Sequence, residues 1–205
     1  MQTEGHDLEA GMGQQNRQTT QARVPFDLVL SHLRAHDFAV LSTVDDAGMP
    51  HSAGVNYGVS RPGRDLAFYV MTRRHLQKAR NVARNPNISL VVPLPRRFLW
   101  FLPPPTIQLR GRAQLLEWTD TEGTAVFSRF WIGRRILEAY RESHRRGETR
   151  ICFLKITPDP RIATYMVGAS IWTLRRRMEA GAATVMIPSA LRSSIASSSL
   201  DHPSS

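Results

Sequence analysis

A succession of short β-type segments, separated by turn signals between residues 38 and 118, constrains the fold more than any other feature of this sequence. FAVLSTV (38–44) and MPHSAGVNYGV (49–59) flank the turn DDAG, where Gly48 supplies a permissive backbone, so they predict a β-hairpin. Three more strands are expected at LAFYVMT (66–72), NISLVV (87–92) and TIQLRGRAQLLEW (106–118). The sequence therefore predicts a mainly β protein.

Helical periodicity lies at the edges of this β-rich region. Short amphipathic helices are expected at PFDLVLSHLRAH (25–36) and HLQKARNVARN (75–85). One long helix is expected over residues 119–147, where Thr119 and Glu122 have capping-box spacing, and two closing strands follow at RICFLKITP (150–158) and RIATYMV (161–167). Because antiparallel strands avoid exposed edges by closing on themselves, we expect a small β-barrel with peripheral helices, an α+β fold.

Composition divides the chain into one domain and two tails. Residues 1–22 are rich in Gln, Thr, Gly and Asn, while residues 181–205 are rich in Ser and nearly aperiodic. Neither segment should bury enough apolar surface to offset its chain entropy. We therefore expect disordered tails at 1–22 and 181–205, and a single folded domain from residue 23 to residue 180.

Charge and hydropathy exclude several classes of protein. No apolar run approaches the roughly 20 residues of a membrane span, and the N-terminus lacks the features of a secretory signal, so a cytoplasmic protein is expected. The net charge of +10 raises nucleic acid as a partner, but the arginine pairs are scattered over several elements without an RNA-binding signature, so we do not expect this function. The lone Cys152 lies in the apolar run ICFLKI and is expected to be a core residue.

The basic stretch TRRHLQK (72–78) stands between a strand and a helix. Its cations gather at the start of the helix, where the helix dipole disfavours positive charge unless an anion is bound there. Free backbone N–H groups, the Thr72 hydroxyl and the Lys78 ammonium together would suit a phosphate. The alternative is an ordinary solvated basic face.

The order of these elements resembles the pyridoxamine 5'-phosphate oxidase-like family of FMN-binding split β-barrels. The likeness rests on GMPH in the hairpin, a strand ending in MT, a Lys after a five-residue gap, Asn85-Pro86 and then SLVV, and it covers about residues 25–118. It implies a six-stranded split β-barrel of antiparallel Greek-key type. It also implies a homodimer with FMN at the two-fold interface.

The resemblance further implies which residues contact the cofactor. The flavin phosphate would be held by the end of the third strand and the following helix, at Met71, Thr72, Gln77 and Lys78. The flavin ring would lie along the second strand, at Ala53, Gly54, Val55 and Asn56. On the fifth strand, alignment on Gly111 places Thr106 near the ring, and Gln108, two residues further, lies on the same face.

Departures from the family bear on substrate and cofactor. Ala53 stands where the pyridoxamine phosphate oxidases carry an Arg, and their C-terminal substrate signature has no clear match, so the vitamin substrate is not expected. A related branch binds the deazaflavin coenzyme (F-420), whose acidic tail would suit Arg73, Arg74 and the pair Arg96-Arg97, although plain surface charge is the alternative. RRFLWFLPPPT (96–106) is expected to serve core or dimer packing rather than to form a substrate lid.

No catalytic side chain or metal ligand is assigned from the sequence. We find no Ser-His-Asp set, no paired carboxylates in the barrel region and no metal-ligand spacing. The flavin itself would transfer hydride or electrons to a small molecule that the sequence does not identify. A flavin-binding protein without turnover is the alternative.

Overall fold

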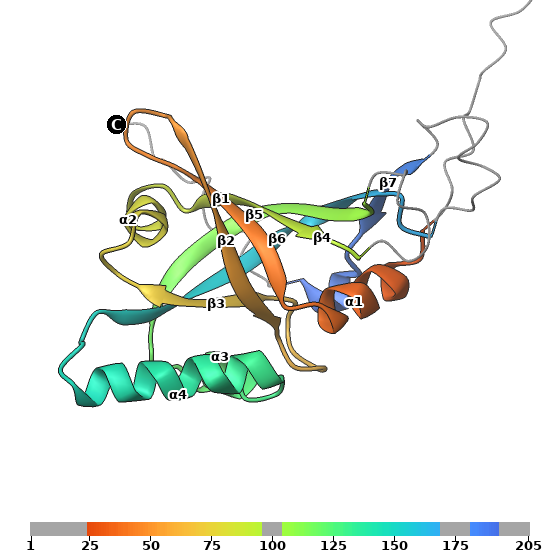
Figure 1. Ribbon diagram of the computed structural model, residues 1–205. Helices are drawn as coiled ribbons and strands as arrows, with labels where there is room; N and C mark the ends of the chain where they lie inside the picture. Colours follow the sequence, from red (N-terminus) through yellow and green to blue (C-terminus); the bar gives the residue numbers. More distant parts are fainter. Residues whose placement is uncertain (1–23, 96–103, 169–180, 193–205) are drawn as a thin grey trace, which may run out of the picture.

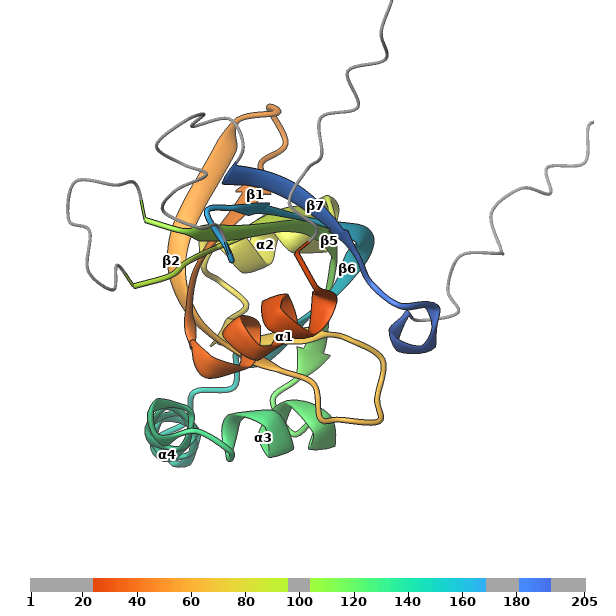
Figure 2. The ribbon, with the colours of Figure 1, turned by 90° about the vertical axis from the view of Figure 1, so that its right-hand side faces the viewer.

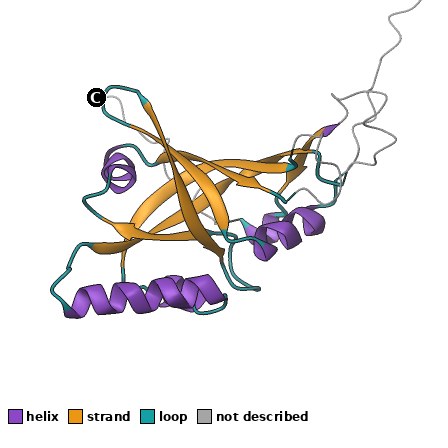
Figure 3. Ribbon diagram, in the orientation of Figure 1, coloured by secondary structure: helices purple, strands orange, loops and turns teal. Residues whose placement is uncertain are grey.

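The computed structural model describes residues 24–95, 104–168 and 181–192. Strands are its main regular structure, with helices at the periphery (Figure 3). In chain order the elements are α1 Phe26–Ala35, β1 Phe38–Val44, β2 Pro50–Val59, β3 Phe68–Arg73, α2 Gln77–Arg84, β4 Asn87–Pro93, β5 Thr106–Glu117, α3 Thr121–Phe127, α4 Trp131–Arg145, β6 Ile151–Tyr165, β7 Ala182–Met186 and a 3-10 turn Ser189–Leu191 (Figure 1). Most of the predicted packing segment 96–106 lies outside the described residues.

Six of the strands form a closed antiparallel barrel. They follow the order β3-β2-β1-β4-β5-β6, and the pairing of β3 with β6 closes the ring. After the β1-β2-β3 meander the chain returns to place β4 beside β1, which is a Greek-key connection. Figure 2 shows α1 lying across one end of this ring. The predicted fold, a mainly β Greek-key barrel with peripheral helices, is confirmed.

Two apolar clusters hold the barrel and its helices together. The larger one fills the barrel interior from alternate strand positions and includes Leu41, Leu90, Ile107 and Leu154, together with Val29, Leu30 and Leu33 of α1. The Tyr57 hydroxyl fixes α1 to this core by donating a hydrogen bond to the Leu33 carbonyl at 2.9 Å. The smaller cluster lies outside the barrel, where Tyr69, Met71 and Phe153 pack against α3 and α4.

The prediction of one continuous helix over residues 119–147 is wrong. It is two helices, α3 and α4, because Phe130 adopts an extended backbone (φ −122°, ψ 153°) and packs its ring against Phe127. The predicted capping box is also wrong, since the N-cap of α3 is Asp120, whose carboxylate accepts a 2.7 Å hydrogen bond from the Gly123 N–H. The longest described helix has 15 residues, and no described helix is long and apolar enough to cross a membrane.

The two predicted closing strands are one strand, β6, of 15 residues. Its register against β5 shifts between Leu109 and Gly111, and the Pro158–Pro160 stretch lies at this irregularity, so the prolines do not interrupt the strand. A Cβ on Gly111 would come within 2.2 Å of the Thr157 carbonyl oxygen. The two strands therefore lie so close here that only glycine fits at position 111. β6 can therefore pair with β3 in its first half and with β7 in its second.

The predicted C-terminal tail begins too early. Residues 182–186 form β7, which pairs antiparallel with residues 161–165 of β6, and a 3-10 turn follows at Ser189–Leu191. Val185 and Ile187 join the barrel core, which supplies the apolar burial that the Ser-rich composition of this region concealed. The remainder of that tail, and residues 1–22, lie outside the described residues.

Candidate cofactor site

The barrel opens where β2 and β3 part. Their pairing runs only from Val59 to Tyr57 on β2 and from Phe68 to Val70 on β3. Beyond this point β3 continues to Arg73 against β6, while β2 continues to Pro50 against β1. Six of the ten predicted cofactor positions, four on β2 and two on β3, flank this divergence: Ala53, Gly54, Val55, Asn56, Met71 and Thr72.

Thr72 carries the most informative group of this region. The residue is 1% exposed, and its Oγ1 has no hydrogen-bond partner among the described residues. A buried hydroxyl without a partner costs about 1–3 kcal/mol, so such a group is rare unless something binds it. Met71 is different, because its side chain points to the opposite side of β3 and packs in the cluster beneath α3 and α4. Only the backbone of Met71 is left to contribute to a site at Thr72.

The start of α2 adds further free donors. A turn closed by the Leu76 N–H to Arg73 carbonyl hydrogen bond, 3.1 Å, leads from β3 into the helix. Leu76 is the N-cap and supplies no side-chain acceptor, so the backbone N–H groups of Gln77 and Lys78 have no acceptor among the described residues. The Lys78 side chain is half-buried and makes no ion pair within the described part of the chain. Free amides, a hydroxyl and an ammonium therefore follow one another over seven residues, a donor set that fits an oxyanion.

The Gln77 side chain, by contrast, is already engaged. Its amide N–H donates to Asn81 Oδ1 at 2.8 Å, and its carbonyl oxygen accepts from Arg80. Asn81 is itself buried and donates to Thr43 Oγ1 at 3.0 Å, which ties α2 to β1. The structure thus leaves the Gln77 backbone, rather than its side chain, to a ligand.

A half-buried face of the barrel runs from β2 to β5. The ladders place Gly54, Val40, Val91 and Gln108 on one row across β2, β1, β4 and β5. Gln108 is therefore three strand spacings, about 14 Å, from Gly54 in the same protomer. The predicted Thr106 lies on the same face but outside this row, opposite Pro93. The two β5 positions are not brought next to the others within one chain.

Phe38 is a residue of this face that the sequence did not single out. It is 48% exposed, and its ring lies over Gly54, where an added Cβ would be only 3.1 Å away. The period-2 alternation of β1, which points Phe38 outward beside Val40, is the signal that could have found it. An exposed aromatic ring over a glycine makes this part of the face flat and apolar.

Arg73 and Arg74, the candidates for an acidic cofactor tail, are occupied. The Arg73 guanidinium lies 4.9 Å from the Tyr140 ring centroid and 3.7 Å from a Glu148 oxygen. Arg74 forms an ion pair with Glu117. Within the described residues these two arginines therefore bind other elements of the fold, which accords with the alternative of structural surface charge.

Other reactive groups near the site are few. Cys152, opposite Thr72 on β6, is fully buried, and burial raises the pKa of its thiol to about 11, so it is no nucleophile at neutral pH. His51 Nδ1, at the hairpin end of β2, is buried and has no partner among the residues that the structure describes. No group of three or more His, Cys, Asp or Glu side chains able to hold a metal ion is found in the part of the chain that the structure describes.

The fold is that of a split-barrel protein, with a set of unpaired donors, among the described residues, at the end of its third strand. Residues 27–163 match the model of the pyridoxamine 5'-phosphate oxidase family, and the chain belongs to that family. The predicted resemblance is confirmed. A search of curated proteins gave no match.

Solved structures with the same fold have other descriptions. The heme storage protein HutZ of Vibrio cholerae is 16% identical, with a TM-score of 0.51 over 65% of this chain and 89% of its own. A heme binding protein of Mycobacterium smegmatis is 15% identical, with a TM-score of 0.56 over 80% of this chain and 60% of its own. ChuZ of Campylobacter jejuni is 12% identical, with a TM-score of 0.58 over 82% of this chain and 62% of its own. At these identities the likeness shows the fold alone.

Proposed function

We propose that this protein is a flavin-dependent oxidoreductase that binds FMN and acts on a small molecule. The observation that carries the proposal is the buried hydroxyl of Thr72, which has no partner among the described residues. The amides of Gln77 and Lys78 and the Lys78 ammonium, likewise without partners in the part of the chain that the structure describes, follow it. A phosphate monoester supplies an acceptor for each of these donors. The bound flavin would supply hydride or electron transfer, while the protein binds, orients and shields it.

The ring of the cofactor would lie on the β2 face. Ala53 to Asn56 offer backbone next to the β2–β3 divergence, and Gly54 has no side chain to hold a ring away from the sheet. Phe38 lies over Gly54 and would have to move or stack beside the flavin, which its exposure allows. The Val55 side chain is buried in the barrel core, so only its backbone could meet the ring. The roles of Thr106 and Gln108 stay predictions from the family resemblance.

FMN is favoured over the deazaflavin coenzyme. The longer acidic tail of the deazaflavin would need cations beyond Lys78, and two of the candidates, Arg73 and Arg74, already hold Glu148 and Glu117. The other two candidates, Arg96 and Arg97, lie outside the described residues. Breaking both ion pairs would offset part of the binding energy. A deazaflavin-dependent reductase, or a flavin-binding protein without turnover, remains the alternative function.

A homodimer completes the proposal. On this face Phe38, Gly54 and Gln108 are exposed, and Val40 and Val91 are half-buried, although several of these side chains are apolar. A second copy seated on it would bury this surface and enclose the flavin ring in two equivalent sites. Sedimentation of the purified protein should give the mass of two chains.

The cofactor is tested by titrating the purified protein with FMN, riboflavin and F-420. We expect quenched FMN fluorescence with a Kd of about 1 μM or lower, and much weaker binding of riboflavin, which lacks the phosphate. Reduction of the bound flavin by NADH or NADPH, followed by transfer to an acceptor, separates an enzyme from a binding protein. Equal affinity for FMN and riboflavin would contradict the phosphate site.

Hemin belongs in the same set of titrations. Two of the proteins that share this fold are described as heme proteins, so heme uptake is the outcome that would redirect the proposal. Hemin binding with a sharp Soret band, together with no affinity for FMN, would replace the flavin by heme. Binding of RNA or DNA that weakens steeply with salt, without flavin affinity, would overturn the proposal altogether.

A further inference from the structure

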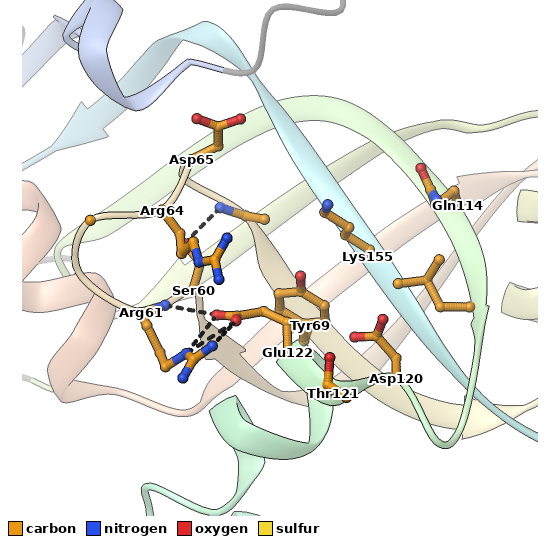
Figure 4. Close-up of a pocket in the computed structure, with 13 residues that line it drawn as sticks. Ser60, Arg61, Arg64, Asp65, Tyr69, Gln114, Asp120, Thr121, Glu122 and Lys155 are labelled. Atoms are coloured by element: carbon orange, nitrogen blue, oxygen red, sulfur yellow. Dashed lines mark hydrogen bonds and ion pairs between the residues drawn. The ribbon is translucent and has the colours of Figure 1, made fainter.

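A polar cavity lies on the outer side of the barrel, away from the proposed flavin site. It has a volume of about 540 Å³ and is formed by the loop between β2 and β3, the start of α3 and the outer faces of β3, β5 and β6 (Figure 4). None of the ten predicted cofactor positions lines it. Volumes of this size are typical of small-molecule sites.

Tyr69 forms the floor of this cavity. The residue is 3% exposed and its ring packs edge-on against Phe153, with 6.4 Å between centroids, so the side chain is held in place. Its hydroxyl makes no hydrogen bond to any described residue and points into the cavity (Figure 4). Burial, with further contributions from Asp120 and Glu122, raises the pKa of Tyr69 to about 12, so the hydroxyl stays protonated and can donate.

Lys155 stands beside this hydroxyl. The β3–β6 ladder pairs Tyr69 directly with Lys155, and the β5–β6 ladder pairs Lys155 with Gln114, so the three side chains form one row on the outer face. Residues paired in this way have Cβ atoms about 5 Å apart. Lys155 makes no ion pair within the described residues, and its ammonium points into the same space as the Tyr69 hydroxyl (Figure 4).

Some of the other charged side chains of the cavity have a partner of opposite charge among the described residues, and others do not. Glu122 is neutralised by Arg61, whose guanidinium donates to it at 2.7 Å and 3.1 Å, and Asp120 caps α3. Arg64 lies near enough to Tyr69 to lower its pKa, and it has no carboxylate partner within the described ranges. Two cations and a phenol thus lack acceptors. Asp65 lines the rim, and Gln114 and the second Asp120 oxygen can accept from a ligand hydroxyl or amine.

We infer that this cavity is a second binding site, for a small polar molecule whose carboxylate or phosphate group is held by Tyr69, Lys155 and Arg64. Hydroxyl or amino donors on the same molecule would meet Asp120 and Gln114. The inference does not rest on the flavin, because the two sites share no residue.

Isothermal titration with glycerol 3-phosphate and with L-serine tests the site and separates a phosphate from a carboxylate ligand. Glycerol is the uncharged control. Each titration is run on the unaltered chain and on Lys78→Ala, because binding at the proposed flavin phosphate site should weaken in that variant, whereas binding in the cavity should not. We expect one of the two probes that carry a phosphate or carboxylate group to bind, and glycerol not to bind.

Three variants assign the binding to the cavity. Lys155→Met should weaken it about ten-fold or more, and Tyr69→Phe, which keeps the ring against Phe153, about three- to ten-fold. Arg141→Met, which removes an exposed cation of α4, should leave it unchanged. Circular dichroism checks that each variant is folded. Binding of neither probe at 10 mM, or binding unaffected by both Lys155→Met and Tyr69→Phe, would overturn the inference whatever the result for FMN.

Discussion

Replacing Thr72 by Val separates a ligand-binding hydroxyl from a structural one. Val matches the shape and the strand preference of Thr, so the change removes the hydroxyl and little else. In the protein without cofactor, Oγ1 is buried with no partner among the described residues, and this costs about 1–3 kcal/mol. Thr72→Val should therefore raise the free energy of unfolding by about 1 kcal/mol, or about 2–4 °C in Tm.

The same change should weaken FMN. Loss of a neutral donor to a phosphate oxygen should cost about 1–2 kcal/mol, which is about a 5- to 30-fold increase in Kd. Stability and affinity then move in opposite directions, which a residue that only supports the fold would not produce. Urea unfolding of the cofactor-free protein and fluorescence titration with FMN measure the two quantities.

Thr164→Val is the matched control. Thr164 is also a buried strand residue, at 4% exposure, but its hydroxyl donates to the Ala183 carbonyl at 3.3 Å. Its replacement should lower the free energy of unfolding by about 0.5–1.5 kcal/mol and leave the intrinsic affinity for FMN unchanged. The reasoning is refuted if Thr72→Val destabilises the protein as Thr164→Val does and binds FMN like the unaltered chain.

Three further outcomes are expected. Lys78→Ala should change the free energy of unfolding by no more than about 0.5 kcal/mol and raise the Kd for FMN about 10- to 150-fold, as measured by the same titration. If the variant binds FMN as the unaltered chain does, the stretch TRRHLQK is a solvated helix start and not a phosphate site. Gly111→Ala should destabilise the barrel by about 1–3 kcal/mol or more in urea unfolding, since its Cβ would meet the Thr157 carbonyl, which is backbone and cannot turn away; an unchanged midpoint would contradict this close approach. Cys152 should react with a thiol reagent only after unfolding, and fast reaction of the native protein at pH 8 would refute its burial. Because burial raises its pKa from 9.0 to about 11 in the folded protein, the contribution of the neutral thiol to stability should be present below about pH 9 and lost as the pH rises toward 11.

Local sequence signals predicted most of the barrel. The first hairpin is an example, because Asp45 accepts hydrogen bonds from the N–H groups of Ala47 and Met49, and Gly48 takes a positive φ of 79°. These requirements are local, so a turn sequence reveals them. The alternation of apolar residues likewise identified the strands, since each strand has one face in the barrel core.

Features that depend on distant contacts were missed. The break between α3 and α4 lies within an apolar pattern that also suits one helix, and only the packing of Phe130 against Phe127 and Gly133 selects the extended backbone. β7 lies within the predicted tail, because its burial comes from pairing with the second half of β6 and not from its own sequence pattern. Single-sequence periodicity carries no information on such pairings.

The candidate site divides in the same way. Thr72 and Lys78 were found because they follow one strand in sequence, and the structure adds that the hydroxyl is buried without a partner and that the Gln77 side chain is bound to Asn81. The occupation of Arg73 by Glu148 and Tyr140 was not predictable, since these partners lie some 70 residues away along the chain. The family resemblance supplied the β2 and β5 positions, and the register then showed how far apart they are.

The half-buried face explains why one protomer offers only one wall of the proposed flavin site. Ser42 and Ser52 share a hydrogen bond of 2.8 Å across β1 and β2, which uses one of their two hydroxyl donors. Beside them, Phe38 covers Gly54, and Val40 continues the apolar surface. The apolar part of this face, at Phe38, Gly54 and Val40, costs little to desolvate and could meet either an aromatic ring system or its own copy. Cofactor binding and dimerisation would then stabilise each other, because each buries surface that the other leaves exposed.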